Sequence, residues 1–187
     1  MSERAYTRLD VEERRRRLLE LGAGLFARHD YDALSMAAIA REAGISKGLL
    51  YHYFPSKQAY FSAALEQNAA ELAALVDPGA PPAAQLDAFL GWVEEHGEAY
   101  AKLVRSAGAV PEVREVMEAV RAATARRILD GLPGPSDPRR RTAVHAWLWF
   151  MDGAILDWLE HKDMSRAELR DLLLGSLAGS LSAAGSP

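Results

Sequence analysis

The chain has 187 residues, of which 49% are hydrophobic and 26% are charged, and its formal net charge is −4. This apolar fraction is ample for a packed core and argues against a disordered chain, while the absence of cysteine excludes a disulfide framework and a thiolate metal site. Because the N-terminus lacks the apolar stretch of a signal peptide and no apolar run approaches the roughly 20 residues of a membrane span, we expect a soluble, cytoplasmic protein without membrane contact.

The charges are unevenly distributed along the chain. Residues 1–57 contain ten Lys and Arg against eight Asp and Glu, a net of +2, which leaves −6 for the rest of the chain. The overall acidity speaks against a nucleic-acid partner, but a mildly basic N-terminal segment on an acidic body is compatible with one.

The first predicted helix runs from Val11 to about Arg28. Asp10 and Glu13 have the spacing of a capping box, so the helix should begin directly after Asp10 and leave a flexible arm before it. The four consecutive arginines at 14–17 precede the apolar stripe of this helix, and such a run is usually a solvated face.

Residues 35–57, SMAAIAREAGISKGLLYHYFPSK, have the pattern of a helix-turn-helix. Ser35 can cap a short helix that Gly44 ends in a left-handed turn, and Ser46 can cap a second helix from Lys47 to Tyr53. The motif should therefore present its second helix to a partner.

The second helix of this motif has one apolar side and one side suited to contact. Leu50 faces inward, whereas Lys47 and Tyr51 lie four residues apart on the opposite side. Free N–H groups at the start of a helix favour a phosphate or a base edge. Lys57 falls in the first turn of the next helix, where the dipole disfavours a cation, so we interpret it as reaching for an external anion.

The segment IAREAGISKGLLYHYFPSKQAYFSAAL, preceded by LLELGAGLFARHDYDALS, resembles the DNA-binding domain of TetR-family transcriptional repressors over about fifty contiguous positions. The resemblance implies that one or two arginines of the run at 14–17 contact the DNA backbone, together with Arg4 or Arg8 on the arm. It also implies a set of DNA-binding residues, which are Ser35, Ser46, Lys47, Gly48, Leu49, Tyr51, His52, Tyr53 and Lys57.

Three residues depart from the family pattern. Gly22 and Gly24 occupy helix-interior positions, where glycine costs about 1 kcal/mol relative to alanine. Asp30 stands where glycine is usual, and aspartate tolerates a left-handed turn less well. These departures predict a comparatively soft domain.

The remaining sequence is read as helices throughout, because no segment alternates apolar and polar residues long enough to form a strand. We expect an all-α fold of about nine helices, with a helix-turn-helix domain at residues 1–56 and an effector-binding and dimerisation domain at residues 57–187. The helices predicted after residue 57 are 57 to about 76, 83 to about 96, 97 to 108, 111 to about 129, 139 to 161, and one that a Ser165–Glu168 capping box starts.

The last two predicted helices carry more apolar residues than one face can bury, which favours a homodimer through them. The resemblance implies the same, since in the family these helices pair with their copies as a four-helix bundle. It also implies a small-molecule effector bound in the C-terminal domain.

Aromatic residues and methionine suit an adaptable apolar cavity, although plain core packing is an alternative for each of them. The candidate ligand-binding residues are Phe89, Trp92, His96, Tyr100, Trp147, Phe150, Met151 and Trp158. His96, Asp152 and Glu98 can orient a ligand if they point inward. The sequence does not name the effector, which we expect to be lipophilic.

No pattern indicates an enzyme, a metal site or a bound cofactor, since the five histidines are scattered and no pair shows metal-ligand spacing with a nearby acid. The sequence therefore predicts a DNA-binding transcriptional regulator, a repressor that a small lipophilic effector releases from a palindromic operator. The alternative is a helical adaptor whose helix-turn-helix contacts protein.

Overall fold

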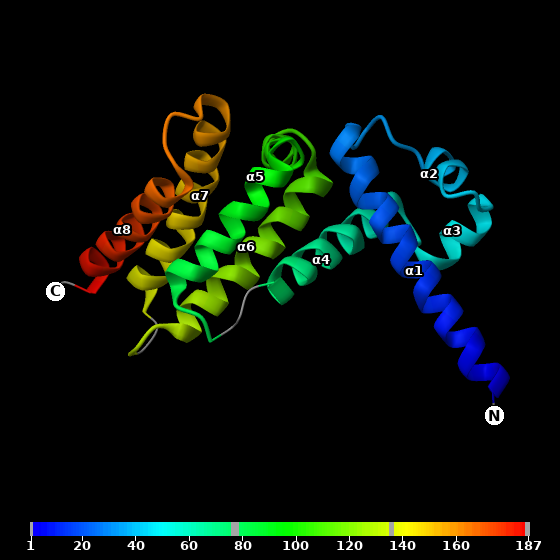
Figure 1. The fold of residues 1–187 in the computed structure, drawn as a ribbon, viewed down its shortest axis with the longest axis horizontal. Coiled ribbons are helices and arrows are strands. Elements are labelled where there is room, and N and C mark those ends of the chain that lie inside the picture. The colour runs from blue at the N-terminus through cyan, green and yellow to red at the C-terminus, as the bar shows by residue number, and fades with distance from the viewer. Residues whose placement is uncertain (1, 76–78, 135–136, 186–187) are drawn as a thin grey trace. The chain divides into compact units, whose positions relative to one another are not determined.

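The computed structural model describes residues 2–75, 79–134 and 137–185, with side chains from residue 11 onward except 69 and 72–75. This part of the chain contains eight helices and no strand, which confirms the all-α prediction (Figure 1). The helices are α1 (Ser2–Arg28), α2 (Met36–Glu42), α3 (Lys47–Tyr53), α4 (Lys57–Leu75), α5 (Pro82–Ala107), α6 (Pro111–Gly131), α7 (Pro138–His161) and α8 (Arg166–Gly185).

The chain divides into two compact units, which we call the head (Met1–Ala74) and the body (Leu75–Pro187). The contacts of the chain place α4 in the head, so the boundary between the two units lies near residue 74. The sequence analysis placed the domain boundary after residue 56, where the helix-turn-helix ends. Each unit has its own apolar core.

Helix α1 begins at Ser2, so the predicted start at Val11 and the flexible arm before it are wrong. Glu13 does not serve as a helix cap: its carboxylate accepts hydrogen bonds from Arg16 Nη2 at 2.8 Å and Arg17 Nε at 2.9 Å. Acid–base pairs three and four residues apart support a continuous helix, and this overrides the local capping signal. The side chains of Arg4, Arg8 and Asp10 lie outside the described residues.

The core of the head places Tyr60 of α4 against α1. The Tyr60 ring is fully buried, and its hydroxyl donates a hydrogen bond to the carbonyl oxygen of Leu18. Burial raises the pKa of Tyr60, so this hydroxyl stays protonated as a donor. A Cβ at Gly22 would lie 2.7 Å from the Tyr60 ring, so glycine is required for this close approach.

The two glycines of α1 therefore predict opposite effects of alanine. Gly22→Ala should destabilise the protein by about 1–3 kcal/mol, because the new methyl group overlaps a buried ring. Gly24→Ala should stabilise it by up to about 1 kcal/mol, since its Cβ would meet only the movable end of Arg28, at 3.3 Å. Urea unfolding of both variants checks the pair, and equal effects would contradict the packing account.

Asp30 does not adopt the left-handed conformation that the sequence comparison suggested. The one described non-glycine residue with positive φ is Lys162, at the end of α7. The strain expected at Asp30 is therefore absent, and Gly22 is needed for packing, so Gly24 alone still supports the prediction of a soft head.

The body packs α5, α6, α7 and α8 together, with α7 and α8 side by side (Figure 1). Helix α7 contributes Val144, Leu148 and Ile155 to the core, each essentially without exposed area. The predicted capping box at the start of α8 is confirmed, since Glu168 Oε2 accepts hydrogen bonds from the Ser165 N–H and hydroxyl, both at 2.7 Å. These bonds lower the pKa of Glu168.

The count of eight rather than nine helices comes from α5, where two helices were predicted. The backbone at His96 is non-helical, with φ −121° and ψ 24°, so α5 consists of two helices joined across a kink, and this kink lies at the predicted boundary between residues 96 and 97. At the adjacent Gly97 a Cβ would lie 2.8 Å from Leu159 Cδ2, so glycine lets the Leu159 side chain of α7 pack closely against this kink.

Candidate nucleic-acid interface

The helix-turn-helix forms as the local signals predict. The Ser35 hydroxyl accepts a hydrogen bond from the Ala38 N–H at 3.1 Å and so caps α2. Gly44 has φ +65°, the left-handed conformation that ends this helix. Ser46 caps α3 in the same way by accepting from the Leu49 N–H at 3.1 Å. Each capping hydroxyl keeps its own proton to donate outward.

Helix α3 is held by its apolar side, where Leu50 is fully buried and Phe54, which follows the helix, is 2% exposed. The opposite side is exposed and includes Lys47, Gly48 and His52. A Cβ at Gly48 would meet nothing within 4 Å, so the backbone there is open to a partner. The recognition side thus consists of a cation, accessible backbone and aromatic rings.

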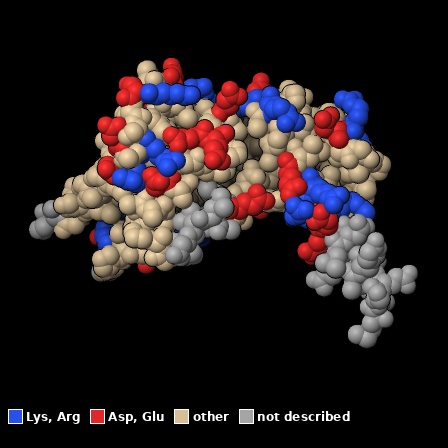
Figure 2. Space-filling model, viewed as in Figure 1, with Lys and Arg blue, Asp and Glu red and all other residues tan. Residues whose placement is uncertain are grey.

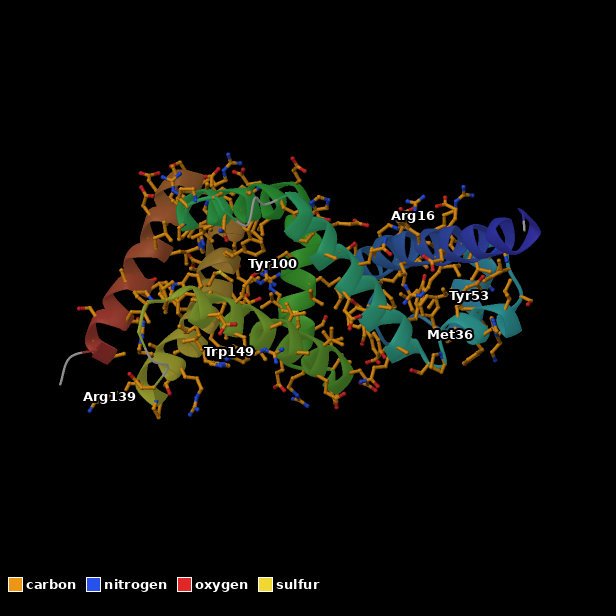
Figure 3. The ribbon with its side chains drawn as sticks, turned by 90° about the horizontal axis from the view of Figure 1, so that it is seen from below. Arg16, Met36, Tyr53, Tyr100, Arg139 and Trp149 are labelled. Atoms are coloured by element: carbon orange, nitrogen blue, oxygen red, sulfur yellow. The ribbon has the colours of Figure 1, made fainter. Side chains whose placement is uncertain are left out.

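The remaining predicted residues of α3 fall in two groups. Tyr51 is 42% exposed, and Lys47 Nζ lies 5.7 Å from its ring centroid, a cation–π contact that positions the ammonium group. Leu49 and Tyr53 are half-buried, and Tyr53 packs on the core of the head (Figure 3). Their accessible surface for a partner is smaller than the sequence pattern suggested.

Lys57 has a partner within the head that the sequence did not reveal. Its Nζ donates to the carbonyl oxygen of Tyr31 at 2.9 Å and lies 4.1 Å from the Tyr31 ring centroid. This bond explains a lysine in the first turn of α4 without an external anion. An ammonium group has three donors, so two remain for a phosphate.

The basic run of α1 is largely neutralised by acids on the same helix. Arg16 pairs with Glu13 and Glu20, and Arg17 pairs with Glu13. Arg15 differs, because its guanidinium lies 5.4 Å from the ring centroid of Phe54 at the end of α3. Arg15 thus contacts the residue that directly follows the recognition helix, and sequence reasoning did not single it out.

The predicted ligand-binding residues of the body differ in their exposure to solvent. Tyr100, Trp147 and Trp158 are core residues, and both indole N–H groups donate to backbone carbonyl oxygens, of Leu173 and Met164. The other candidates lie nearer the surface: Phe89, Trp92 and Met151 are half-buried, Phe150 is 46% exposed, and His96 is exposed and stacked on Trp92.

Of the polar candidates in the body, only Asp152 points inward. Asp152 is 6% exposed, whereas His96 and Glu98 are exposed. Its Oδ1 accepts from the Tyr100 hydroxyl at 2.6 Å, and its Oδ2 accepts from Arg121 Nε at 2.9 Å and Nη2 at 2.6 Å. Burial, followed by the charge of Asp152, raises the pKa of Tyr100. Sequence reasoning missed Arg121.

Two surface hollows are described, and neither is lined by the predicted ligand-binding residues. One lies in the head, with Arg15, His52, Tyr53 and Gln67 among its lining residues. The other lies in the body between the start of α7 and the end of α8. On the face shown in Figure 2, acidic and basic side chains are interspersed, so charge alone does not mark a binding surface. None of the described helices is long and apolar enough to cross a bilayer.

Comparison with known proteins gives two consecutive family matches. Residues 18–64 match the family described as bacterial regulatory proteins, tetR family, and residues 78–179 match the tetracyclin repressor-like C-terminal domain. Among solved structures, the crystal structure of a tetR-family transcriptional regulator from Streptomyces coelicolor superposes with a TM-score of 0.70. The sequence identity is 32%, and the match covers 92% of this chain and 82% of that one.

Curated relatives agree with these matches. The HTH-type transcriptional repressor KstR of Mycobacterium tuberculosis is 27% identical in an alignment of 163 residues that covers 80% of this chain and 73% of that protein. The HTH-type transcriptional activator FasR of Mycolicibacterium smegmatis is 32% identical in an alignment of 101 residues that covers 50% of this chain and 46% of that protein.

Proposed function

We propose that this chain, which belongs to the tetR family of bacterial regulatory proteins and is a DNA-binding transcriptional regulator, is a repressor that a small effector releases from a palindromic operator. The direction of regulation is proposed from the repressor KstR, whose alignment spans far more of this chain than that of the activator FasR. The comparisons do not favour the adaptor alternative.

The main support for the proposal is the exposed side of α3, which is suited to contact DNA. Lys47 and Gly48 occupy the N-terminal end of a capped helix, where free N–H groups face outward. We assign Lys47, Gly48 and Leu49 to base edges, with Leu49 touching a thymine methyl group. We assign phosphate contacts to the residues around them, which are Ser35, Ser46, Tyr51, His52, Tyr53, Lys57 and Arg15.

This division predicts different effects for the two lysines of the motif. Lys57→Ala should weaken binding to all DNA sequences alike and lower the salt slope of binding by about one, because one phosphate contact is lost. Lys47→Ala should relax sequence preference, at a cost of roughly 1–3 kcal/mol if its base contact is bidentate. Fluorescence anisotropy on operator and scrambled DNA at several salt concentrations measures both effects.

The exposed body residue Arg114 offers the control, since Arg114→Ala should leave the slope unchanged. Circular dichroism must show that Lys57→Ala remains folded, because this variant also loses the bond to the Tyr31 carbonyl. If wild type and Lys57→Ala have the same salt slope, Lys57 serves only the internal bond and the phosphate assignment is refuted.

A homodimer through α7 and α8 is proposed from the surface of these helices. Three large hydrophobic side chains are exposed there: Trp149 at 59%, Phe150 at 46% and Leu172 at 48%. A Cβ at Gly153, or at Gly175 and Gly179 of α8, would meet nothing within 4 Å, so a second chain can approach closely. Two heads in such a dimer would bind half-sites about one helical turn, ~34–36 Å, apart.

A further inference from the structure

Trp149 of α7 has the most exposed large hydrophobic side chain among the described residues, at 59%. Its ring is nevertheless held in place, because the ring centroid lies 4.0 Å from Cζ of Arg121 and the indole stacks on the guanidinium. An exposed tryptophan leaves a large apolar area in water, which a partner can bury. A ring that is both exposed and held is therefore suited to anchor a partner.

The guanidinium beneath the ring is fixed from inside the body. Arg121 donates to Asp152 Oδ2 through Nε at 2.9 Å and Nη2 at 2.6 Å, and the Tyr100 hydroxyl donates to Oδ1 at 2.6 Å. We call these three residues, which come from α5, α6 and α7, the buried network. Trp149 lies at the surface above it, whereas Tyr100 lies inside the body (Figure 3). The network thus gives the ring a rigid support.

The buried network is a costly way to fill a core. Arg121 is 7% exposed and Asp152 is 6% exposed, so both ions have lost most of their water. Arg121 Nη1 is buried and has no hydrogen-bond partner among the described residues, which adds to the cost. Apolar residues would fill the same space without these costs. The network therefore calls for a use beyond packing, and the support of Trp149 is one that the geometry shows.

The surface around Trp149 has the charge pattern of an interface. Asp152 is the only Asp, Glu, Lys or Arg at positions 142–156 of α7, and it is buried and paired. Positions 172–185 of α8 contain none. Exposed charges flank this uncharged centre, at Arg141, Asp157, Glu168 and Asp171. An interface typically has a centre depleted of charge and a polar rim.

A second copy of the chain is the partner that fits this surface. Both helices present an uncharged centre, so a two-fold axis can bring the face of one copy onto the same face of another without opposing like charges. Gly153 lies four residues after Trp149 on the same side of α7, and a Cβ there would meet nothing within 4 Å. A second chain can therefore reach the edge of the ring and exclude water from its stack on Arg121, which strengthens that contact.

We propose that Trp149 is the anchor of the homodimer and that Arg121, held by Asp152 and Tyr100, is the residue that positions it. This inference rests on the proposed function, in which α7 and α8 form the dimer, and it names the side chain that supplies most of the affinity. A side chain that is already ordered in the free chain loses less conformational entropy on association. Tryptophan and arginine at the centre of an interface commonly carry most of its binding energy.

The first test measures the dimer dissociation constant of the full chain by sedimentation equilibrium. Trp149→Ala should raise this constant by about thirtyfold or more, because the anchor is lost. Phe150→Ala is the matched control: Phe150 is 46% exposed on the same helix, and its loss should raise the constant by less than about tenfold. Trp149→Phe keeps a ring above Arg121 and should fall between wild type and Trp149→Ala. Urea unfolding checks that each variant is folded.

The second test separates positioning from a merely structural role. The network variant carries Tyr100→Phe, Arg121→Met and Asp152→Leu together, so that no charge is left buried. It should raise the dimer dissociation constant by about tenfold, because the ring loses its support. Adding Trp149→Ala to it should give the constant of Trp149→Ala alone, since Arg121 acts through the tryptophan. Two effects that multiply instead would contradict the positioning role.

The failure of this inference and the failure of the proposed dimer give different results. A wild-type chain that stays monomeric at micromolar concentration contradicts the homodimer itself. A wild-type dimer whose dissociation constant is the same in Trp149→Ala contradicts only the anchor, and it assigns the exposed ring to a partner other than a second copy. Equal losses in Trp149→Ala and Phe150→Ala would also overturn the inference, because support by Arg121 would then add nothing.

Discussion

Asp152→Ala is expected to destabilise the protein by about 3–5 kcal/mol, because it leaves the buried guanidinium of Arg121 without its counter-ion. The same change removes the acceptor of the Tyr100 hydroxyl, which burial and the neighbouring charge keep protonated. Two groups buried among α5, α6 and α7 would then lack partners at once. Urea unfolding followed by circular dichroism measures the loss.

The network variant provides the control for this prediction. With Tyr100→Phe, Arg121→Met and Asp152→Leu together, no ion or hydroxyl is left buried, and the stability should return to within about 1–2 kcal/mol of wild type or exceed it. If Asp152→Ala cost less than about 1 kcal/mol, Arg121 would be reaching water, and the buried network would not exist in solution.

The second large effect is expected on operator affinity. A compound that binds the body and acts as the effector should weaken operator binding about a hundredfold, which corresponds to a coupling free energy of about 2.7 kcal/mol. Such a compound must bind the DNA-incompetent state better than the competent one, since equal affinity for both states shifts nothing. Operator DNA should weaken the compound by the same factor.

The tryptophans give a direct readout of this coupling. All four, Trp92, Trp147, Trp149 and Trp158, lie in the body and none lies in the head. Emission should therefore report ligand binding, while labelled DNA reports operator binding in parallel. A saturating compound that changes emission but leaves operator affinity unchanged would refute effector control, although DNA binding by the head would stand.

The helix-turn-helix could be predicted almost to the residue, because its boundaries depend on local chemistry. A serine that caps its own helix and a glycine at positive φ act within a few positions of the chain, as Ser35, Gly44 and Ser46 do. The predicted start of α1 was wrong because a capping signal can also be read in another way. Glu13 can cap a helix or pair with Arg16 and Arg17, and the pattern alone does not decide between them.

The residues that sequence reasoning missed depend on contacts between distant parts of the chain. Lys57 reaches a carbonyl group at Tyr31, 26 positions earlier, and Arg121 meets Asp152 31 positions away. No periodicity reports such pairs, because they arise when whole helices pack. Aromatic composition likewise does not separate core residues such as Trp147 from residues that line a ligand site, since both are apolar.

The central claim is that a dimer binds a palindrome with two copies of α3. The most direct test is to measure how many protein chains bind one DNA fragment selected by the protein. Genomic fragments retained by the protein are footprinted, and the complex is analysed by sedimentation. The account predicts two chains on an inverted repeat with half-site centres about one helical turn, ~34–36 Å, apart, and a large loss of affinity when one half-site is scrambled. A chain that sediments as a monomer at micromolar concentration and protects no inverted repeat would contradict it.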